Sequence, residues 1–197
     1  PGAHGAAGRM NPARGRAGPG CGGPACETLP MGAPFTRKGH VLLLRSRDRL
    51  FDRDWRLTLV GSEAPDPVSA NGLHALADEL GIASRVRFAG TVVGEALEAL
   101  WQSADVFALA THYEGYGMAI AEALKRGLPI VVTKGGAAGE LLTPEAGLGC
   151  PVGERDQLTK SLRRGVFRAE LRGGRTQAGW EVGDGRPAWA GRAEAGG

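Results

Sequence analysis

Apolar runs and helical patterns alternate along the chain between residues 31 and 164. Short apolar segments bounded by Gly or Pro predict buried strands, and longer segments with apolar residues three and four positions apart predict helices. The predicted strands span 55–61, 85–90, 105–110, 129–133 and 147–152, with the last at an edge of the sheet. The predicted helices span 37–51, 69–81, 94–104, 117–127, 136–142 and 154–164. This alternation predicts an α/β fold, a single doubly wound, Rossmann-like parallel sheet with helices on both faces.

The strand expected at the start of this alternation is the weakest predicted element. Its segment, residues 31–35, reads MGAPF, and Gly and Pro are rare in central strands. We therefore expect this strand to be frayed or missing. For the helix at 69–81, Ser69 or Asn71 is the candidate N-cap and Gly81 is the expected stop.

Both ends of the chain differ in composition from the part between them. In residues 1–30, Gly and Pro fill thirteen of thirty positions and Leu29 is the only large aliphatic residue. Residues 165–197 are rich in Gly and Arg, and no periodic pattern surrounds Trp180 or Trp189. Such segments cannot bury enough apolar surface to offset the entropy lost on ordering. We expect one folded domain at 31–164 between two disordered flanks.

The charge balance argues against a specific nucleic-acid partner. Residues 31–164 hold sixteen Lys and Arg against sixteen Asp and Glu, so the net charge of +3 comes from the flanks. The predicted domain is therefore neutral, and the flanking arginines leave open only non-specific contact with RNA.

The cysteines and the hydropathy exclude further classes. Cys21, Cys26 and Cys150 have neither zinc spacing nor a disulfide pattern, and Cys150 has the apolar surroundings of a buried structural thiol. The sequence contains no secretory signal pattern and no apolar run long enough to span a membrane. We expect a cytoplasmic protein.

The loop and helix at 111–122 carry the main candidate site. The chain leaves a predicted strand, turns through Gly115 and Gly117, and then enters a helix. In a parallel sheet such loops gather beyond the carboxyl ends of the strands, where ligands bind. Unpaired amides and the positive end of the helix favour a phosphate there. Glu114 would lie at the rim of this anion site, and Glu122 about one turn into the helix.

The two glutamates allow three interpretations. Ionised carboxylates accept hydrogen bonds from hydroxyl groups, so Glu114 and Glu122 could bind a transferred sugar and a ribose on either side of a diphosphate. A glycosidase-type pair of acid and nucleophile is the second interpretation, although that chemistry has no phosphate cradle. In the third, Glu122 is a solvated helix residue and Glu114 is a loop charge. The spacing alone does not decide between them.

Other loops hold weaker candidates. Arg37 and Lys38 precede a predicted helix, where they would neutralise a diphosphate, although a solvated turn is the simpler interpretation. Residues 134–140 form either a glycine-rich helix start or a tight turn. The loop after the strand at 55–61 lacks the G-x-G-x-x-G fingerprint, which disfavours a nicotinamide enzyme. No His cluster or HExxH pattern predicts a metal site.

Taken together, several segments resemble the nucleotide-sugar-binding, C-terminal half of a family 4 glycosyltransferase (glycosyl transferases group 1) of the GT-B fold. The similar segments are RKGH, WRLTLVGS, LADELGIASRVRFAG, LWQSADVFALATHYEGYGMAIAEALKRGLPIVVTKGGAAGELL and GLGCPVGERDQL. The E-x7-E spacing from Glu114 to Glu122 is degenerate alone but highly specific in this setting. The resemblance covers residues 37–162.

The resemblance implies roles for the matching charged residues. Lys38, together with Arg37, would hold the diphosphate of the donor. Glu114 would contact the transferred sugar, and Glu122 would bind the ribose. Lys38 and Glu114 are the residues that the resemblance makes catalytic.

It also implies backbone and base contacts. Donor binding would include the turn of Gly115, Tyr116 and Gly117, with the last two amides meeting phosphate. The base would lie against a short stretch of strand made of Val86, Arg87 and Phe88.

The chemistry that the resemblance implies is hexosyl transfer from a nucleotide-diphosphate sugar with retention of anomeric configuration. The nucleoside diphosphate leaves from the face that the acceptor attacks, and Lys38 and helix amides stabilise it. No cofactor and no metal is required. The acceptor stays open among a glycan, a lipid and a small molecule, and membrane contact is expected only through an absent domain.

The departures from the family leave alternatives open. A GT-B enzyme binds its acceptor mainly with an amino-terminal domain, which residues 1–30 cannot form, so we expect a fragment that transfers little or no sugar by itself. A non-catalytic fragment or interaction module is one alternative. A sugar-nucleotide epimerase or a phosphorylase of the same architecture is another.

Overall fold

The structure is a computed structural model, and it describes residues 25–32, 38–50, 52, 54–142 and 147–167 of the 197-residue chain. In this part of the chain six strands alternate with helices. The strands are β1 (Cys26–Leu29), β2 (Trp55–Val60), β3 (Val86–Gly90), β4 (Val106–Leu109), β5 (Ile130–Thr133) and β6 (Gly147–Cys150). The helices are α1 (His40–Asp48), α2 (Pro67–Glu79), α3 (Gly94–Ser103), α4 (Met118–Lys125), α5 (Ala137–Glu140) and α6 (Arg155–Phe167), with a 3-10 turn η3 (Ala83–Arg85) before β3.

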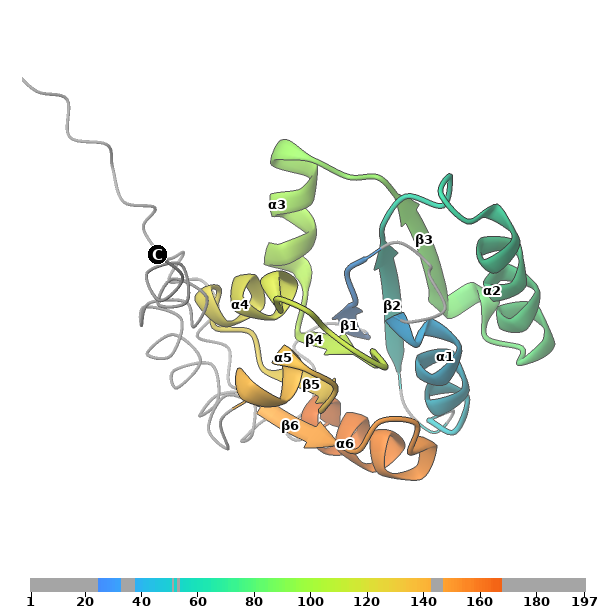
Figure 1. The fold of residues 1–197 in the computed structure, drawn as a ribbon. Coiled ribbons are helices and arrows are strands. Elements are labelled where there is room, and N and C mark those ends of the chain that lie inside the picture. Colours follow the sequence, from blue (N-terminus) through green and yellow to red (C-terminus); the bar gives the residue numbers. More distant parts are fainter. Residues whose placement is uncertain (1–24, 33–37, 51, 53, 143–146, 168–197) are drawn as a thin grey trace, which may run out of the picture.

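The strands form one parallel sheet in the order β3-β2-β1-β4-β5-β6. From β1 at the centre of the sheet, the described chain builds outward to β3, then crosses back through α3 to β4 and builds outward to β6 (Figure 1). This topology confirms the predicted doubly wound, Rossmann-like fold, including the edge position of β6.

Helices cover both faces of the sheet (Figure 1), and β4 shows how the residues divide between them. Val106 and Ala108 pack in the core under α1, α2 and α6, whereas Phe107 and Leu109 pack in the core under α3 and α4. All four side chains are buried, because successive residues of a strand point to opposite faces. A strand buried on both faces has a continuous apolar run, and this is the VFAL pattern of β4.

The central strand β1 corrects the predicted domain boundary. Cys26–Leu29 falls within the range 1–30 that composition predicts to be disordered, yet it pairs with β2 on one side and β4 on the other. Cys26, Thr28 and Leu29 are completely buried, and Arg47 donates a hydrogen bond to the Thr28 hydroxyl. Neighbouring strands thus bury a segment with one large aliphatic residue. The prediction was wrong because local composition does not report such long-range pairing.

The first strand of the sheet starts at Cys26, five positions before the segment MGAPF in which it was expected. Met31 makes an isolated bridge to Val60, and Gly32 has a φ of 133° that ends the extended conformation. Residues 33–35, on which the prediction of a frayed or missing strand partly falls, lie outside the described residues.

Two smaller predictions also change. The side chain that caps α2 is Asp66, which accepts a hydrogen bond from the Ser69 amide, and Pro67 takes the first helical position. Ser69 and Asn71 therefore lie inside the helix, where the cap prediction is wrong, while Gly81 follows its end with a φ of 67° as expected. Helix α6 continues past residue 164 to Phe167, and Trp180 and Trp189 lie outside the described residues.

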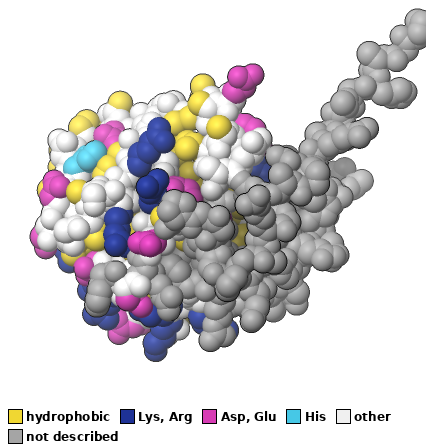
Figure 2. All heavy atoms as spheres, turned by 180° about the vertical axis from the view of Figure 1, so that it is seen from behind, with side chains coloured by type: hydrophobic (Ala, Val, Ile, Leu, Met, Phe, Trp, Pro, Cys, Tyr) yellow, Lys and Arg dark blue, Asp and Glu magenta, His cyan; other side chains and the backbone are white. Residues whose placement is uncertain are grey.

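The surface mixes charges of both signs. On the face shown in Figure 2, basic and acidic side chains lie close to one another. No described helix has the length and apolar character needed to cross a membrane. Cys150 is buried at the end of β6, and this burial raises the pKa of its thiol to about 11, as expected for a structural cysteine.

The position of β1 predicts the effect of a core substitution. Leu29→Ala should lower the free energy of unfolding by about 2–4 kcal/mol, because it removes a fully buried side chain and leaves a cavity. Val68 is 83% exposed, so Val68→Ala should change stability by less than about 0.5 kcal/mol. Urea denaturation followed by circular dichroism measures both. Equal stability of the two variants would contradict a central β1.

Candidate functional site

Three strand-to-helix connections meet at the carboxyl edge of the sheet. They lead from β1 to α1, from β4 to α4, and from β5 to α5. Each of these helices follows a glycine with positive φ: Gly39 before α1, Gly117 before α4 and Gly136 before α5. The three strands are adjacent and parallel, so these helix starts lie close together.

Gly39 packs against the end of β4 more closely than any other residue could. A Cβ atom at this position would lie 1.8 Å from the carbonyl oxygen of Ala110, and its φ is 65°. Both the space and the backbone conformation therefore require glycine. The contact holds the first turn of α1 against the residue that opens the connection from β4 to α4.

This contact brings Lys38 to Glu114. Lys38 Nζ donates a hydrogen bond to Glu114 Oε2 at 2.8 Å, and the two side chains are only 17% and 14% exposed. The aliphatic part of the Lys38 side chain lies against Gly32: a Cβ atom added to Gly32 would be 3.1 Å from Lys38 Cε. The structure thus joins two predicted site residues that are 76 positions apart in the sequence.

The backbone around Glu114 is fixed from both sides. Its amide donates to the Gly135 carbonyl at 3.0 Å, and its carbonyl accepts from the Ala137 amide at 2.8 Å. Its Oε1 accepts from the Gly117 amide at 3.3 Å. Glu114 therefore connects the starts of α4 and α5. Residues 134–136 make a short turn from β5 into α5, so both interpretations of residues 134–140, a glycine-rich helix start and a tight turn, fit the structure.

Glu122 lies in the second turn of α4, as predicted, but its partners differ from those of Glu114. Arg126 donates to Glu122 Oε1, and the Glu122 side chain is 42% exposed. Arg126 also donates to Glu98 Oε2 of α3 at 2.7 Å. Each of the two candidate carboxylates thus has its own cation, Lys38 for Glu114 and Arg126 for Glu122.

The other predicted site residues fall in three places. Arg37 lies outside the described residues. Gly115 borders open space and the Tyr116 side chain is 73% exposed, so this turn faces solvent at the carboxyl edge. The predicted base-binding stretch is most of β3, in which the middle residue is exposed and the outer two are half-buried; these are Val86, Arg87 and Phe88.

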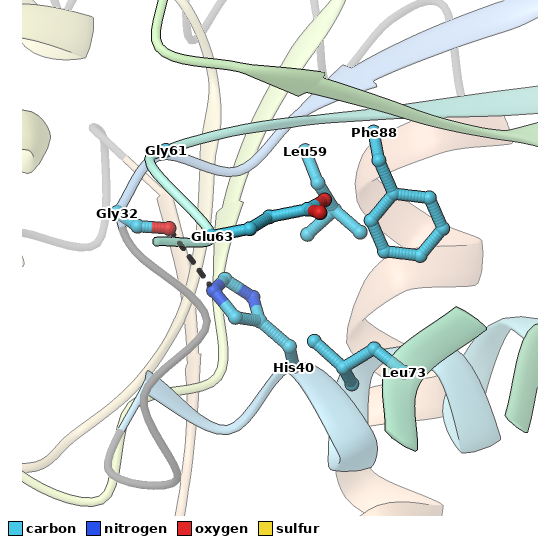
Figure 3. A pocket seen from close by; sticks show the side chains of 7 residues that line it. All are labelled: Gly32, His40, Leu59, Gly61, Glu63, Leu73 and Phe88. Atoms are coloured by element: carbon cyan, nitrogen blue, oxygen red, sulfur yellow. Dashed lines mark hydrogen bonds between the residues drawn. The ribbon is translucent and has the colours of Figure 1, made fainter. Parts of the chain in front are cut away.

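A hollow open to solvent lies next to this site, at the ends of β1 and β2 (Figure 3). It is a shallow depression, and its lining includes Gly32, His40, Glu63 and the ring of Phe88. His40 Nε2 donates to the Gly32 carbonyl at 3.3 Å, which holds the start of α1 to the loop under Lys38. The hollow and the Lys38–Glu114 pair thus share Gly32 as a common wall.

Inside the hollow a carboxylate lies near an aromatic ring. Figure 3 shows the Glu63 side chain extending between His40 and Phe88. Glu63 Oε1 is 3.3 Å from His74 Nε2, and the rings of His74 and Phe88 have centroids 3.8 Å apart. His74 thus contacts both the Phe88 ring and the Glu63 carboxylate at the edge of the hollow.

Residues 29–166 match the family model of glycosyl transferases group 1. The chain belongs to this family. Its fold is that of the C-terminal half of a GT-B glycosyltransferase, as the resemblance of its sequence segments predicts.

Known group 1 glycosyl transferases and GT-B structures are similar to this chain over part of their length. Mannosylfructose-phosphate synthase of Agrobacterium fabrum is 35% identical over 111 residues, which are 53% of this chain and 24% of that protein. The C-terminal domain of the glycosyl transferase LpcC from Francisella tularensis superposes with a TM-score of 0.71 at 19% identity, covering 81% of this chain and 85% of that one. Anabaena HepE, in complex with UDP and glucose, superposes with a TM-score of 0.77 at 19% identity, covering 88% of this chain and 49% of that one.

The candidate site also contains charged residues that are not among those predicted from the sequence. Arg126 follows Glu122 by four positions, a spacing that predicts an ion pair on a helix and could have identified it. Glu98 and Glu63 have no such local signal. They belong to α3 and to the loop after β2, and only the folded chain brings them to the site. The chain spans about a quarter of the length of the curated relative above.

The Gly39 contact predicts a specific loss of stability in this glycosyl transferase domain. Gly39→Ala should cost about 2–4 kcal/mol, because the new methyl group meets the Ala110 carbonyl and the backbone has positive φ. Gly72 lies within α2 with open space around it, so Gly72→Ala should stabilise the protein by about 0.5–1 kcal/mol. Thermal and urea unfolding measure both changes. If Gly39→Ala left the free energy of unfolding unchanged, the close contact between the start of α1 and the end of β4 would be contradicted.

Proposed function

We propose that this chain binds a nucleotide-diphosphate sugar at the carboxyl edge of its sheet and forms the donor half of a retaining, family 4-like hexosyltransferase. The observation that carries the proposal is the Lys38–Glu114 pair at the meeting point of the starts of α1 and α4. A cation, two positive helix ends and a carboxylate in one place suit a ligand that is both anionic and rich in hydroxyl groups.

The diphosphate would lie between the two helix starts. Lys38 supplies a positive charge there, and the amide of Gly117 becomes available to phosphate when Glu114 turns toward the sugar. Arg37 and the Tyr116 amide are further candidate donors from the same two loops. These groups stabilise the charge that builds up on the diphosphate as it leaves, so they would act mainly in the transition state.

The two carboxylates would bind the sugars on either side of the diphosphate. Glu114 lies at the rim beside Lys38 and would accept hydrogen bonds from the transferred hexose. Glu122 lies one turn down α4 and would accept from the ribose hydroxyls. The hollow lined by Phe88 would take the base, since it shares Gly32 with the stem of Lys38.

Transfer would proceed on one face of the hexose. The bond from its anomeric carbon to the diphosphate oxygen breaks, and the acceptor oxygen bonds to the same face, which retains the configuration. The acceptor itself would be held by another part of the enzyme. Support for this donor class comes from Anabaena HepE, whose structure contains UDP and glucose, and from the transferases among the curated relatives.

Binding of nucleoside diphosphates tests the proposal. By calorimetry, the chain should bind UDP or GDP, and Lys38→Ala should weaken binding by about 10- to 100-fold, the value of a charge-assisted hydrogen bond. Glu122→Ala should weaken it in the same direction. Lys160 is exposed on α6, so Lys160→Ala removes the same charge elsewhere and should leave the affinity unchanged. A wild-type chain that binds neither nucleotide would refute the proposal.

A further inference from the structure

Arg126 links α4 to α3 by contacting Glu122 and Glu98, and the proposed function gives it no role. We call these three residues the clamp. The Arg126 guanidinium donates through one amino group to Glu122 and through the other to Glu98 at 2.7 Å. The Trp101 ring lies beneath it, 5.0 Å from the guanidinium carbon to the ring centroid. Two hydrogen bonds and one aromatic face thus set the position of a side chain that is only 28% exposed.

The clamp leaves half of the Glu122 carboxylate available. Arg126 engages Oε1, and in the described part of the chain Oε2 accepts no hydrogen bond. A carboxylate has four lone-pair positions on two oxygens, so one oxygen can face a cation while the other accepts from hydroxyl groups. The Glu122 side chain is 42% exposed, so the clamp does not bury it.

The clamp also changes the charge that a ligand meets. An unpaired carboxylate in the second turn of α4 would repel a diphosphate bound at the start of the same helix. Pairing with Arg126 offsets that charge, as Lys38 offsets the charge of Glu114. Glu98 remains ionised over a wide pH range, because its hydrogen bond with Arg126 lowers the pKa of its carboxyl group. The anchor of the clamp therefore stays charged.

We propose that Arg126 is a positioning residue that holds the Glu122 carboxylate ready for the two hydroxyl groups of a ribose. The inference rests on the proposed function, in which Glu122 binds the ribose of the donor. The planar fork of arginine can contact Glu122 and Glu98 together, and lysine, a single ammonium on a flexible stem, cannot hold both in the same geometry. Arg126 acts through Glu122 and does not contact the reacting atoms.

The preference for ribose over deoxyribose tests this role. The affinities of UDP and 2′-deoxy-UDP, and of GDP and 2′-deoxy-GDP, are measured by calorimetry on the full chain. The wild-type chain should prefer the ribonucleotide by about tenfold or more, because a carboxylate accepts from the 2′-hydroxyl. Arg126→Ala and Arg126→Lys should each reduce this preference to about twofold. A general loss of folding would weaken both nucleotides equally and leave the ratio unchanged.

Matched variants separate the clamp from the site itself. Arg163 pairs with Asp52 on the surface of α6, so Arg163→Ala removes an equivalent ion pair and should keep the wild-type preference. Glu98→Gln alters only an exposed anchor of the clamp and should lower the preference two- to threefold even if Arg126→Ala does not fold.

Two results would overturn the proposal in different ways. If Glu122→Ala abolishes the preference while Arg126→Ala and Glu98→Gln keep it, Glu122 binds ribose without the clamp, and only the role of Arg126 is refuted. If the wild-type chain binds no nucleoside diphosphate, the donor site itself is refuted, and the clamp with it.

Discussion

The contact between Gly39 and the carbonyl of Ala110 is the constraint on which the site depends. The start of α1 meets the residue that follows β4 there, with no room for a side chain between them. Lys38 precedes this contact and Glu114 follows it, and their ion pair is a consequence of the backbone geometry. The polar groups are therefore held by close packing of main chain, which is a more rigid support than flexible side chains provide.

Most of the fold could be predicted from the sequence because most elements carry their own local signal. The strand VFAL is apolar throughout, and Gly81 ends α2 where the periodic pattern stops. β1 has no such signal, since Cys26 and Thr28 become buried only when β2 and β4 flank them. The cap of α2 is Asp66, three residues before Ser69 and five before Asn71, because the helix already begins at Pro67, ahead of its apolar pattern.

In the candidate site, too, the sequence predicts the local features and does not predict contacts between distant segments. Glu114, Gly117 and Glu122 belong to one continuous segment, so the sequence pattern places them correctly relative to α4. Two of the ion pairs in this site join segments that are distant in the sequence. Glu98 approaches Arg126 from α3, and Lys38 reaches Glu114 across 76 positions. Side-chain pairing between distant segments is set by the packing of helices on the sheet, which no local spacing encodes.

The order of the strands has a consequence for how this domain assembles and opens. The halves β3-β2-β1 and β4-β5-β6 join along one seam, where the register consists of Thr28↔Val106 and Leu29↔Phe107, against four pairs between β5 and β6. This seam joins segments that are 78 residues apart and has the shortest ladder, so closing it loses more chain entropy than local pairing does. The Gly39–Ala110 contact crosses the same seam, so any opening there would have to break this packing and would separate Lys38 from Glu114.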